Sequence, residues 1–242
     1  VRGALGRAAV VLANSAGMER RARALGAART RVVHLGSDLP APVAPAAGRL
    51  VTVGHLIARK RHGDVLRALW LLRDRYPAAE WVVVGDGPER AGLERLAGEL
   101  GLAERVRFTG ALPPERAVAE ARRGTVFVLP SVDEAFGVAY VEAMAGGVPA
   151  IGCRGEDGPE EIAAAGDGLR LVPPADPEAL ARELDALLRG DGWRHELGAA
   201  ARATVEREFT WAACGRATVA AYEEALACAP SVGHDPDDGY AP

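Results

Sequence analysis

Short runs of β-branched residues alternate with longer segments rich in Ala, Leu, Arg and Glu along most of the 242-residue chain. This alternation is typical of strand–helix–strand units, whose strands lie parallel in one sheet. The predicted fold class is therefore α/β, a Rossmann-like parallel sheet with helices on both faces. The strands are expected at residues 9–13, 31–35, 49–53, 81–85, 106–109, 126–129, 150–153 and 169–172.

Helices are expected between these strands, and only helices follow the last one. The hydrophobic content of 49% is ample for a packed core. The predicted helices are residues 16–25, 64–76, 89–100, 114–121, 137–145, 159–164, 177–189, 193–206 and 211–227.

The stretch "DLPAPVAPAAG", residues 38–48, interrupts this rhythm and is typical of a linker. Residues 1–37 are then expected to be the last strand–helix–strand unit of a truncated preceding domain. Residues 49–228 form a second domain with a closing helix. Residues 229–242 have little apolar surface to bury and are expected to be disordered. Because the chain begins with Val, we expect it to be a piece of a longer protein.

Charge and cysteine content exclude several classes of function. The net charge is -4 with both signs dispersed, which gives no basic surface for nucleic acid. Cys153, Cys214 and Cys228 lack metal-ligand spacing and form no disulfide framework, which fits a cytoplasmic protein. The opening residues resemble a short signal peptide, but a strand followed by a helix fits equally well and is preferred.

Ligands of open parallel sheets bind beyond the carboxyl ends of the strands, so the loops there are the candidate sites. Gly54 ends the strand at residues 49–53 and is followed by a basic cluster, in which Lys60 is the preferred anion ligand over the alternative of a solvated loop. His34 and His62 are interpreted as incidental. The "GDGP" at residues 85–88 fits either a tight turn or a ligand contact.

Glu134 and Glu142 stand seven residues apart in an otherwise apolar stretch. Val138, Val141 and Ala145 recur at helical spacing, which places Glu142 within an apolar stripe where a carboxylate needs a partner. Glu134 falls just before the helix, where the dipole and free backbone N–H groups favour anions. Both carboxylates can face one crevice. The alternative is that Glu142 is a surface residue beside the stripe.

The segment "SVDEAFGVAYVEAMAGGVPAIG" resembles the E-x7-E region of retaining glycosyltransferases of the GT-B fold, family 4, with Glu134 and Glu142 at its two glutamates. The resemblance extends over most of the chain. "VTVGHLIARKRH" is similar to that family's GRLxxxKG loop, and "GPEEI" to its later glycine-rich loop. "REFTWAACGRATVAAYEEAL" is similar to the helix that crosses back to the first domain, which the resemblance identifies as the acceptor domain.

The resemblance implies transfer of a sugar from a nucleotide-sugar donor, UDP- or GDP-linked, with retention of configuration and without a metal or other cofactor. It gives catalytic roles to Glu134 on the donor sugar and to Lys60 on the diphosphate, and it places the ribose hydroxyls on Glu142. The donor-binding residues that it implies are Gly54, His55, Lys60, Glu134, Phe136, Gly137, Val138 and Glu142.

Two positions depart from the family pattern: His55 replaces its arginine, and Arg61 replaces its glycine. Arg59 or Arg61 could substitute for the lost cation. Because nearly all of the acceptor domain is absent, we expect this chain to bind nucleotide and to transfer sugar poorly or not at all. The acceptor stays unknown. Self-association of the chain and peripheral membrane contact through the absent domain are compatible with this interpretation.

Alternative functions remain at the sequence level. A sugar-nucleotide epimerase or a phosphorylase shares the GT-B architecture. A non-catalytic subunit that only binds sugar nucleotide or a partner protein is a second alternative. An NAD-linked dehydrogenase is disfavoured, because "GDGP" lacks the GxGxxG spacing.

Overall fold

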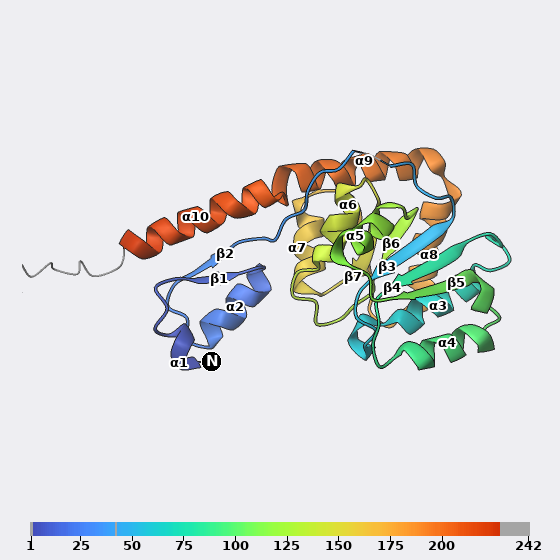
Figure 1. Cartoon of the computed structure of the whole chain (residues 1–242), viewed down its shortest axis with the longest axis horizontal. Helices are drawn as coiled ribbons and strands as arrows, with labels where there is room; N and C mark the ends of the chain where they lie inside the picture. Colours follow the sequence, from blue (N-terminus) through green and yellow to red (C-terminus); the bar gives the residue numbers. More distant parts are fainter. Residues whose placement is uncertain (1, 42, 228–242) are drawn as a thin grey trace, which may run out of the picture.

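The computed structural model describes residues 2–41 and 43–227 (Figure 1), so the predicted tail at 229–242 lies outside the described residues. The strands are β1 Val11–Ala13, β2 Thr30–Val32, β3 Arg49–Val53, β4 Glu80–Val84, β5 Val106–Gly110, β6 Val126–Val128, β7 Ala150–Cys153 and β8 Leu169–Val172. The α-helices are α1 Arg2–Leu5, α2 Ala16–Ala24, α3 His62–Leu71, α4 Arg90–Glu99, α5 Pro114–Arg122, α6 Val138–Ala145, α7 Asp157–Ala165, α8 Pro177–Arg189, α9 Asp191–Glu208 and α10 Trp211–Ala227. Two 3-10 helices, η1 Ala58–Lys60 and η2 Ala103–Arg105, complete the described elements.

Six strands form one fully parallel sheet in the order β5-β4-β3-β6-β7-β8. The chain builds outward from β3 through β4 to β5, then returns to the other side of β3 with β6 and continues to β8. The loops after β3 and β6 therefore leave neighbouring strands toward different helices. This topological switch point is where open α/β sheets form a ligand crevice.

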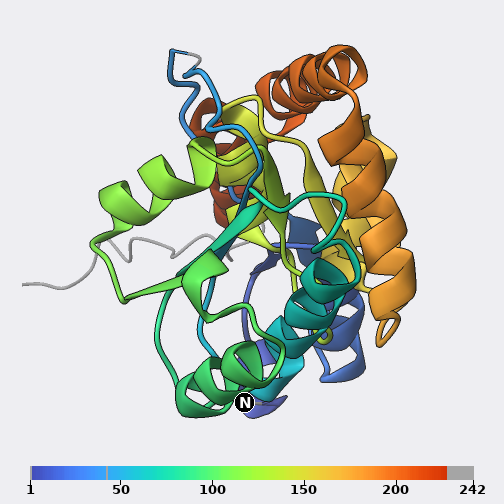
Figure 2. The ribbon, with the colours of Figure 1, turned by 90° about the vertical axis from the view of Figure 1, so that its right-hand side faces the viewer.

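Helices cover both faces of this sheet (Figure 2), as the alternating sequence predicts. Helix α3 packs against α4 and α8 on one face, and α6 packs against α5 and α9 on the other. Successive residues of a strand point to opposite faces. Trp81 and Val83 of β4 accordingly belong to the core cluster under α3 and α8, whereas Val82 and Val84 face Leu112 and the first turn of α5.

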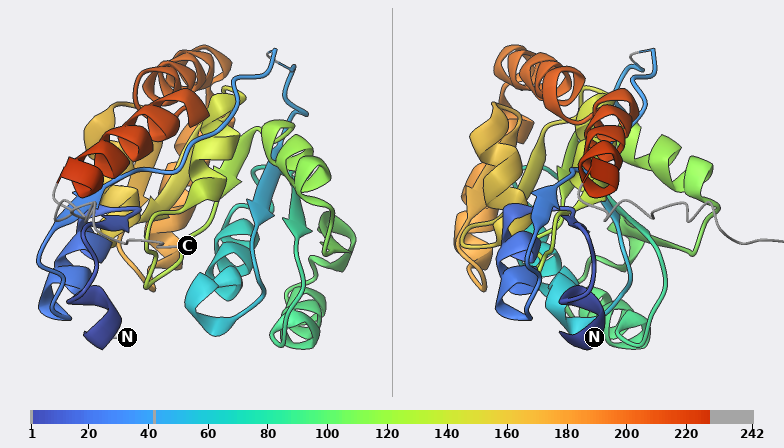
Figure 3. Two further views of the ribbon diagram at one scale, coloured as in Figure 1. Left: turned by 60° about the vertical axis from the view of Figure 1, so that its left-hand side comes forward. Right: turned by 90° about the vertical axis from the view of Figure 1, so that its left-hand side faces the viewer.

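The first 37 residues form a separate strand–helix–strand unit, in which β1 and β2 pair in parallel and α2 connects them. Figures 1 and 3 show this unit, in blue, beside α10, in red, and away from the main sheet. Arg31 of β2 pairs with Glu224 of α10 at 2.8 Å. Among the described residues of the predicted linker at 38–48 there is no helix or strand, and the Ala46 N–H bonds the Arg123 carbonyl at 3.0 Å.

All eight predicted strands occur within a few residues of their expected bounds, but two expectations about helices are wrong. The helix predicted at 64–76 ends at Leu71, and a series of turns follows as far as Tyr76. The helix predicted at 159–164 is present and begins two residues earlier, at Asp157. Helix α6 has no one-sided apolar stripe, because α5, α9 and the sheet bury it on nearly all sides.

Within the described residues, no helix is both long and apolar enough to cross a membrane.

Candidate functional site

The loops after β3 and β6 meet at the switch point and are bonded through their backbones. The N–H of Val132 donates to the carbonyl of Arg59 at 2.8 Å. The guanidinium of Arg59 donates to the carbonyl of Asp133 at 3.1 Å. These contacts hold two segments 74 residues apart in the chain in a fixed relation.

Lys60, the last residue of η1, lies directly against Glu134. Its Nζ atom is 2.5 Å from Glu134 Oε2, which also accepts a hydrogen bond from Ser131 Oγ at 2.6 Å. The Lys60 and Glu134 side chains are only 12% and 10% exposed, so their opposite charges are largely screened from solvent. The structure therefore brings together the two residues for which the family resemblance implies catalytic roles.

The N-terminus of α6 adds backbone donors beside this ion pair. Gly137 has φ +93°, and a Cβ atom there would lie 2.4 Å from the Tyr140 ring, so both the turn and the packing require glycine. Within the described part of the chain, the N–H groups of Phe136, Gly137 and Val138 have no hydrogen-bond acceptor. Such free amides at a helix start favour an anion.

The loop after β7 supports the Glu134 segment from behind. The backbone N–H of Glu134 donates to Glu156 Oε2 at 3.0 Å, and its carbonyl accepts from the Gly158 N–H at 3.3 Å. A Cβ atom at Gly158 would lie 2.2 Å from the Phe136 carbonyl oxygen. The "GPEEI" glycine thus lets α7 approach the loop before α6 closely.

Glu142 lies one turn into α6 on the partly exposed side shared with Val138 and Ala139. Burial raises the pKa of its carboxyl group, while the positive charge of Arg122 acts in the opposite direction. Arg122 bonds the Glu142 backbone carbonyl at 3.1 Å, and within residues 2–41 and 43–227 no side chain or backbone group bonds the carboxylate itself. The carboxylate is therefore half-buried and ready to accept hydrogen bonds.

Gly54 and His55 line a cavity of about 510 Å³ at the carboxyl ends of β3, β4 and β5. Its other walls include Gly85 and Gly87 after β4 and Leu112 before α5. His55 is exposed, and a Cβ atom at Gly87 would lie 2.5 Å from its Cδ2 atom, so the imidazole lies against Gly87. Among the predicted donor residues, Gly54 and His55 thus line this cavity, whereas Lys60 and Glu134 form the ion pair outside its lining.

The two candidate substitutes for the family arginine differ in position. Arg59 stands 4.0 Å from Glu134 Oε2 and shares its surroundings. Arg61 turns away and donates from Nε to Asp64 Oδ2 at 2.6 Å. Arg61 also has φ +55°, the left-handed conformation that glycine adopts readily. Of the two, Arg59 is the cation at the site.

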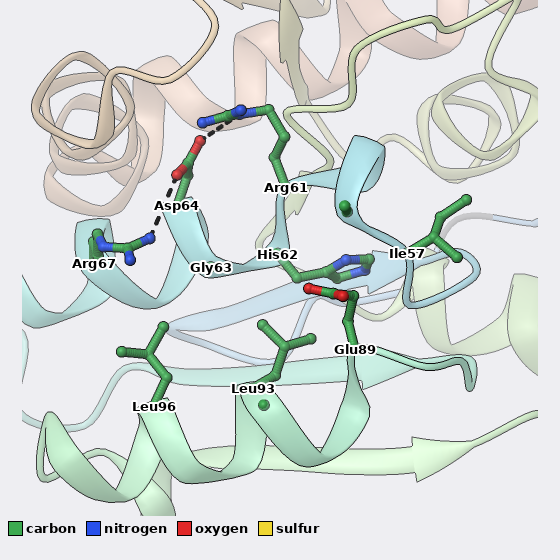
Figure 4. A pocket seen from close by; sticks show the side chains of 11 residues that line it. Ile57, Arg61, His62, Gly63, Asp64, Arg67, Glu89, Leu93 and Leu96 are labelled. Atoms are coloured by element: carbon green, nitrogen blue, oxygen red, sulfur yellow. Dashed lines mark hydrogen bonds and ion pairs between the residues drawn. The ribbon is translucent and has the colours of Figure 1, made fainter.

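A second cavity, of about 330 Å³, lies between the first turns of α3 and α4 (Figure 4). His62 and Glu89 line it, and Figure 4 shows the Glu89 carboxylate beside the imidazole ring. Both ring nitrogens of His62 are buried without a partner among the described residues, and burial lowers the pKa of His62 to about 4. Because both nitrogens are inaccessible to solvent, His62 presents no ligand atom to the cavity.

Sequence reasoning named Arg59 only as one of two possible substitute cations and did not assign Ser131 or Glu156 to the site, although all three contact the Glu134 segment. The sequence offered one signal for these contacts: Ser131 stands three residues before Glu134, close enough for its hydroxyl to reach the carboxylate. The described residues contain no cluster of three or more His, Cys, Asp or Glu that could hold a metal ion.

Comparisons with known proteins identify the family. The sequence model of the family "Glycosyl transferases group 1" matches residues 46–204. A GDP-mannose-dependent alpha-(1-6)-phosphatidylinositol monomannoside mannosyltransferase of Mycolicibacterium smegmatis is 32% identical over 67% of the chain. A D-inositol 3-phosphate glycosyltransferase of Corynebacterium jeikeium is 34% identical over 75% of it. The chain spans 44% of the length of each of these relatives.

Solved structures share the fold. A sucrose-phosphate synthase from Thermosynechococcus elongatus superposes with a TM-score of 0.78 at 27% identity, over 94% of this chain and 61% of that one. Anabaena Alr3699/HepE in complex with UDP and glucose gives a TM-score of 0.79 at 21% identity, over 92% and 66% of the two chains. With the family match over most of its length and this parallel sheet covered by helices on both faces, the chain belongs to the group 1 glycosyl transferases of the GT-B fold.

Proposed function

We propose that this chain is the donor-binding half of a retaining, family 4 glycosyltransferase that uses a nucleotide-sugar donor. The observation that carries the proposal is the meeting of Lys60, Glu134 and the N-terminus of α6 at the switch point of the sheet. A cation, a hydroxyl acceptor and free amides close together match the chemical groups of a sugar diphosphate.

Lys60 and the free amides before α6 are proposed to bind the diphosphate. Negative charge grows on the diphosphate as the glycosidic bond breaks, so donors fixed at that position stabilise the transition state. In the resting site the Lys60 ammonium instead bonds Glu134. Binding of the donor would therefore exchange this ion pair for contacts from Lys60 to phosphate and from Glu134 to the hydroxyls of the sugar.

Glu142 is proposed to accept hydrogen bonds from the ribose hydroxyls. Its half-buried carboxylate offers oxygens that no described group occupies, and charge-assisted hydrogen bonds would offset its desolvation. The cavity beside Gly54 and His55 has the volume and the mixed lining for the base of a UDP or GDP donor. No cofactor or metal is required in this proposal, and the proposed location is the cytoplasm.

Calorimetric titration with UDP, GDP, ADP and their common sugar conjugates tests the proposal directly. The wild-type chain should bind one nucleotide selectively, and Lys60→Ala should weaken binding of that nucleotide while preserving the far-ultraviolet circular dichroism spectrum. Arg95, exposed on α4, is a matched control, and Arg95→Ala should bind like the wild type. Absence of binding by every nucleotide, to the chain and to a full-length protein containing it, would refute the proposal.

The whole reaction also needs the region that this chain does not span in its relatives. We therefore expect the chain alone to bind nucleotide without transferring sugar at a measurable rate. Product analysis with and without an acceptor separates transfer from epimerisation, because an epimerase changes the donor with no acceptor present. Sugar transfer by the isolated chain at the rate of a full-length protein would contradict this division of labour.

A further inference from the structure

We propose that His34, in the unit before the linker, is a positioning residue of the donor site. The inference rests on the proposed function, and it adds a residue that lies outside the family match at 46–204. His34 follows β2 and reaches across to the loop that carries Glu134 and Phe136. The geometry assigns it the task of fixing that loop.

The ring of His34 stacks on Phe136. Their centroids are 5.4 Å apart, and the planes differ by 12°. Phe209, at the end of α9, meets both rings edge-on, at 5.3 Å from His34 and 5.7 Å from Phe136. The Phe136 side chain, 2% exposed, is therefore held between two rings that come from opposite ends of the chain.

A hydrogen bond sets the orientation of the His34 ring. Its Nε2 atom lies 2.9 Å from Oε1 of Glu161 on α7. The two oxygens of Glu161 also accept from the backbone N–H of Ala16, at 3.2 and 3.0 Å. Glu161 thus ties the start of α2 and the ring of His34 to the same helix.

Phe136 converts this contact into an effect on the donor site. It stands two residues after Glu134 and directly before Gly137, so its backbone belongs to the proposed anion-binding turn. Gly158 of α7 presses on the backbone of Phe136, while His34 and Phe209 hold its side chain. Loss of the His34 or Phe209 ring would therefore allow the turn at Phe136 and Gly137, with its backbone amides, to move.

The test compares His34→Ala, which removes the ring, with His34→Phe, which keeps a stacking ring. Calorimetry with UDP, GDP and ADP measures affinity, and hydrogen exchange measures protection of the amides at residues 134–138. Aromatic pairs are strong enough that His34→Ala should weaken nucleotide binding by about three- to tenfold. It should also accelerate exchange at residues 134–138, and His34→Phe should restore most of both properties.

Leu184→Ala is the control for a merely structural role, because Leu184 is buried in the core cluster under α3 and α8, apart from the cluster that contains Phe136. It should lower the melting temperature and leave nucleotide affinity unchanged. The proposal is overturned if His34→Ala alters only the melting temperature, or if His34→Phe fails to restore protection at residues 134–138. If the wild-type chain binds none of the nucleotides, the donor assignment fails, and the exchange comparison still decides whether His34 positions the loop.

Discussion

Burial raises the pKa of Glu142 above its ordinary value of 4.5, because desolvation disfavours the charged form more than Arg122 favours it. At neutral pH the Glu142 carboxylate is charged in the unfolded chain, and burying that charge on folding lowers the free energy of unfolding. A residue that destabilises the free protein in this way is expected to interact with something that the free protein lacks. The proposed ribose contact supplies that interaction.

Glu142→Gln should therefore separate binding from stability. The amide removes the buried charge, so the melting temperature should rise or stay level. Loss of the charge-assisted bonds should weaken nucleotide binding by about 10- to 100-fold. Thermal unfolding and calorimetry of the same preparations test both expectations. Glu99→Gln, at an exposed site on α4, should change neither, and equal nucleotide affinity in Glu142→Gln and wild type would contradict the role.

His62 predicts a pH dependence of stability. Its pKa falls from 6.5 to about 4 in the fold because burial penalises the charged ring, and nearby Lys60 acts in the same direction. The unfolded chain therefore binds a proton first as the pH falls. Above about pH 6.5 His62 is neutral in both states and does not lower the free energy of unfolding. Between about pH 6.5 and pH 4 protonation of the unfolded chain lowers that free energy progressively, by about 3 kcal/mol in total.

His62→Leu should remove this loss, since an apolar side chain of similar size needs no partner for its atoms. Urea denaturation at pH 7 and pH 4.5 should show a smaller difference in unfolding free energy for the variant than for the wild type. His195→Gln, at an exposed position on α9, should keep the wild-type difference. An unchanged difference in His62→Leu would show that other groups cause the acid sensitivity.

Single residues stand out in the sequence where their chemistry is unusual. A lysine in a basic loop and two glutamates in an apolar segment contrast with their neighbours, and the structure places Lys60 against Glu134. His34 and His62 gave no such contrast and were interpreted as incidental. Their surroundings come from distant segments, Phe209 and Glu161 for His34 and Trp81 for His62, which no local pattern reports.

Among the elements, the approach of α7 to the loop before α6 depends on Gly158. A Cβ atom there would lie 2.2 Å from the Phe136 carbonyl oxygen and 2.4 Å from its Cα atom, so backbone must move. Gly158→Ala should lower the free energy of unfolding by about 1–3 kcal/mol and weaken nucleotide binding. Chemical denaturation and calorimetry measure the two effects.

Gly98→Ala on α4 provides the contrast. No atom lies within 4 Å of the position that its Cβ would take, so the substitution should stabilise the protein by up to about 1 kcal/mol through helix propensity. Destabilisation by Gly98→Ala, or none by Gly158→Ala, would contradict the packing described for these two glycines.

Elements were predictable wherever burial on both faces produces a continuous β-branched run, as in β3 and β4. The end of α3 was not predictable in this way. Leu72 is buried and continues the apolar period, but the chain turns there and Tyr76 donates to Asp185 of α8 at 2.7 Å. The apolar spacing continues through that turn because its side chains pack into the same core as those of α3, although the backbone is no longer helical.

On the scale of the whole molecule, α10 carries a row of exposed large apolar residues. Trp211, Val219, Tyr222 and Leu226 are 48–74% exposed and share one face of the helix. Exposed apolar surface of this kind favours association.

We expect the chain to self-associate, with a sedimentation coefficient that rises with concentration. Tyr222→Asp/Leu226→Asp should remove this dependence, whereas Ala217→Asp, on the opposite side of the helix, should keep it. A wild-type chain that sediments as a monomer at all concentrations would contradict the expectation.

The order of strands in the sheet could not be read from the sequence. Parallel strands alone do not tell which loops become neighbours, and the meeting of Lys60 with Glu134 depends on β6 pairing with β3. The resemblance to a known family implied only that Lys60 and Glu134 bind parts of one donor, and it gave no strand order. The loops were identified by their composition, and their juxtaposition required the fold.

The bond between Lys60 and Glu134 means that a ligand of this site competes with an internal ion pair. A ligand that binds here separates Lys60 from Glu134, so its binding free energy depends on whether it supplies a new partner to both side chains. A free phosphate would pair with Lys60 and leave the Glu134 carboxylate without a partner. A neutral sugar would bond Glu134 and leave Lys60 without one. Under the proposed function, only a molecule that joins an anion to neighbouring hydroxyls replaces both partners at once, so we expect free phosphate and free sugar to bind more weakly than the nucleotide sugar.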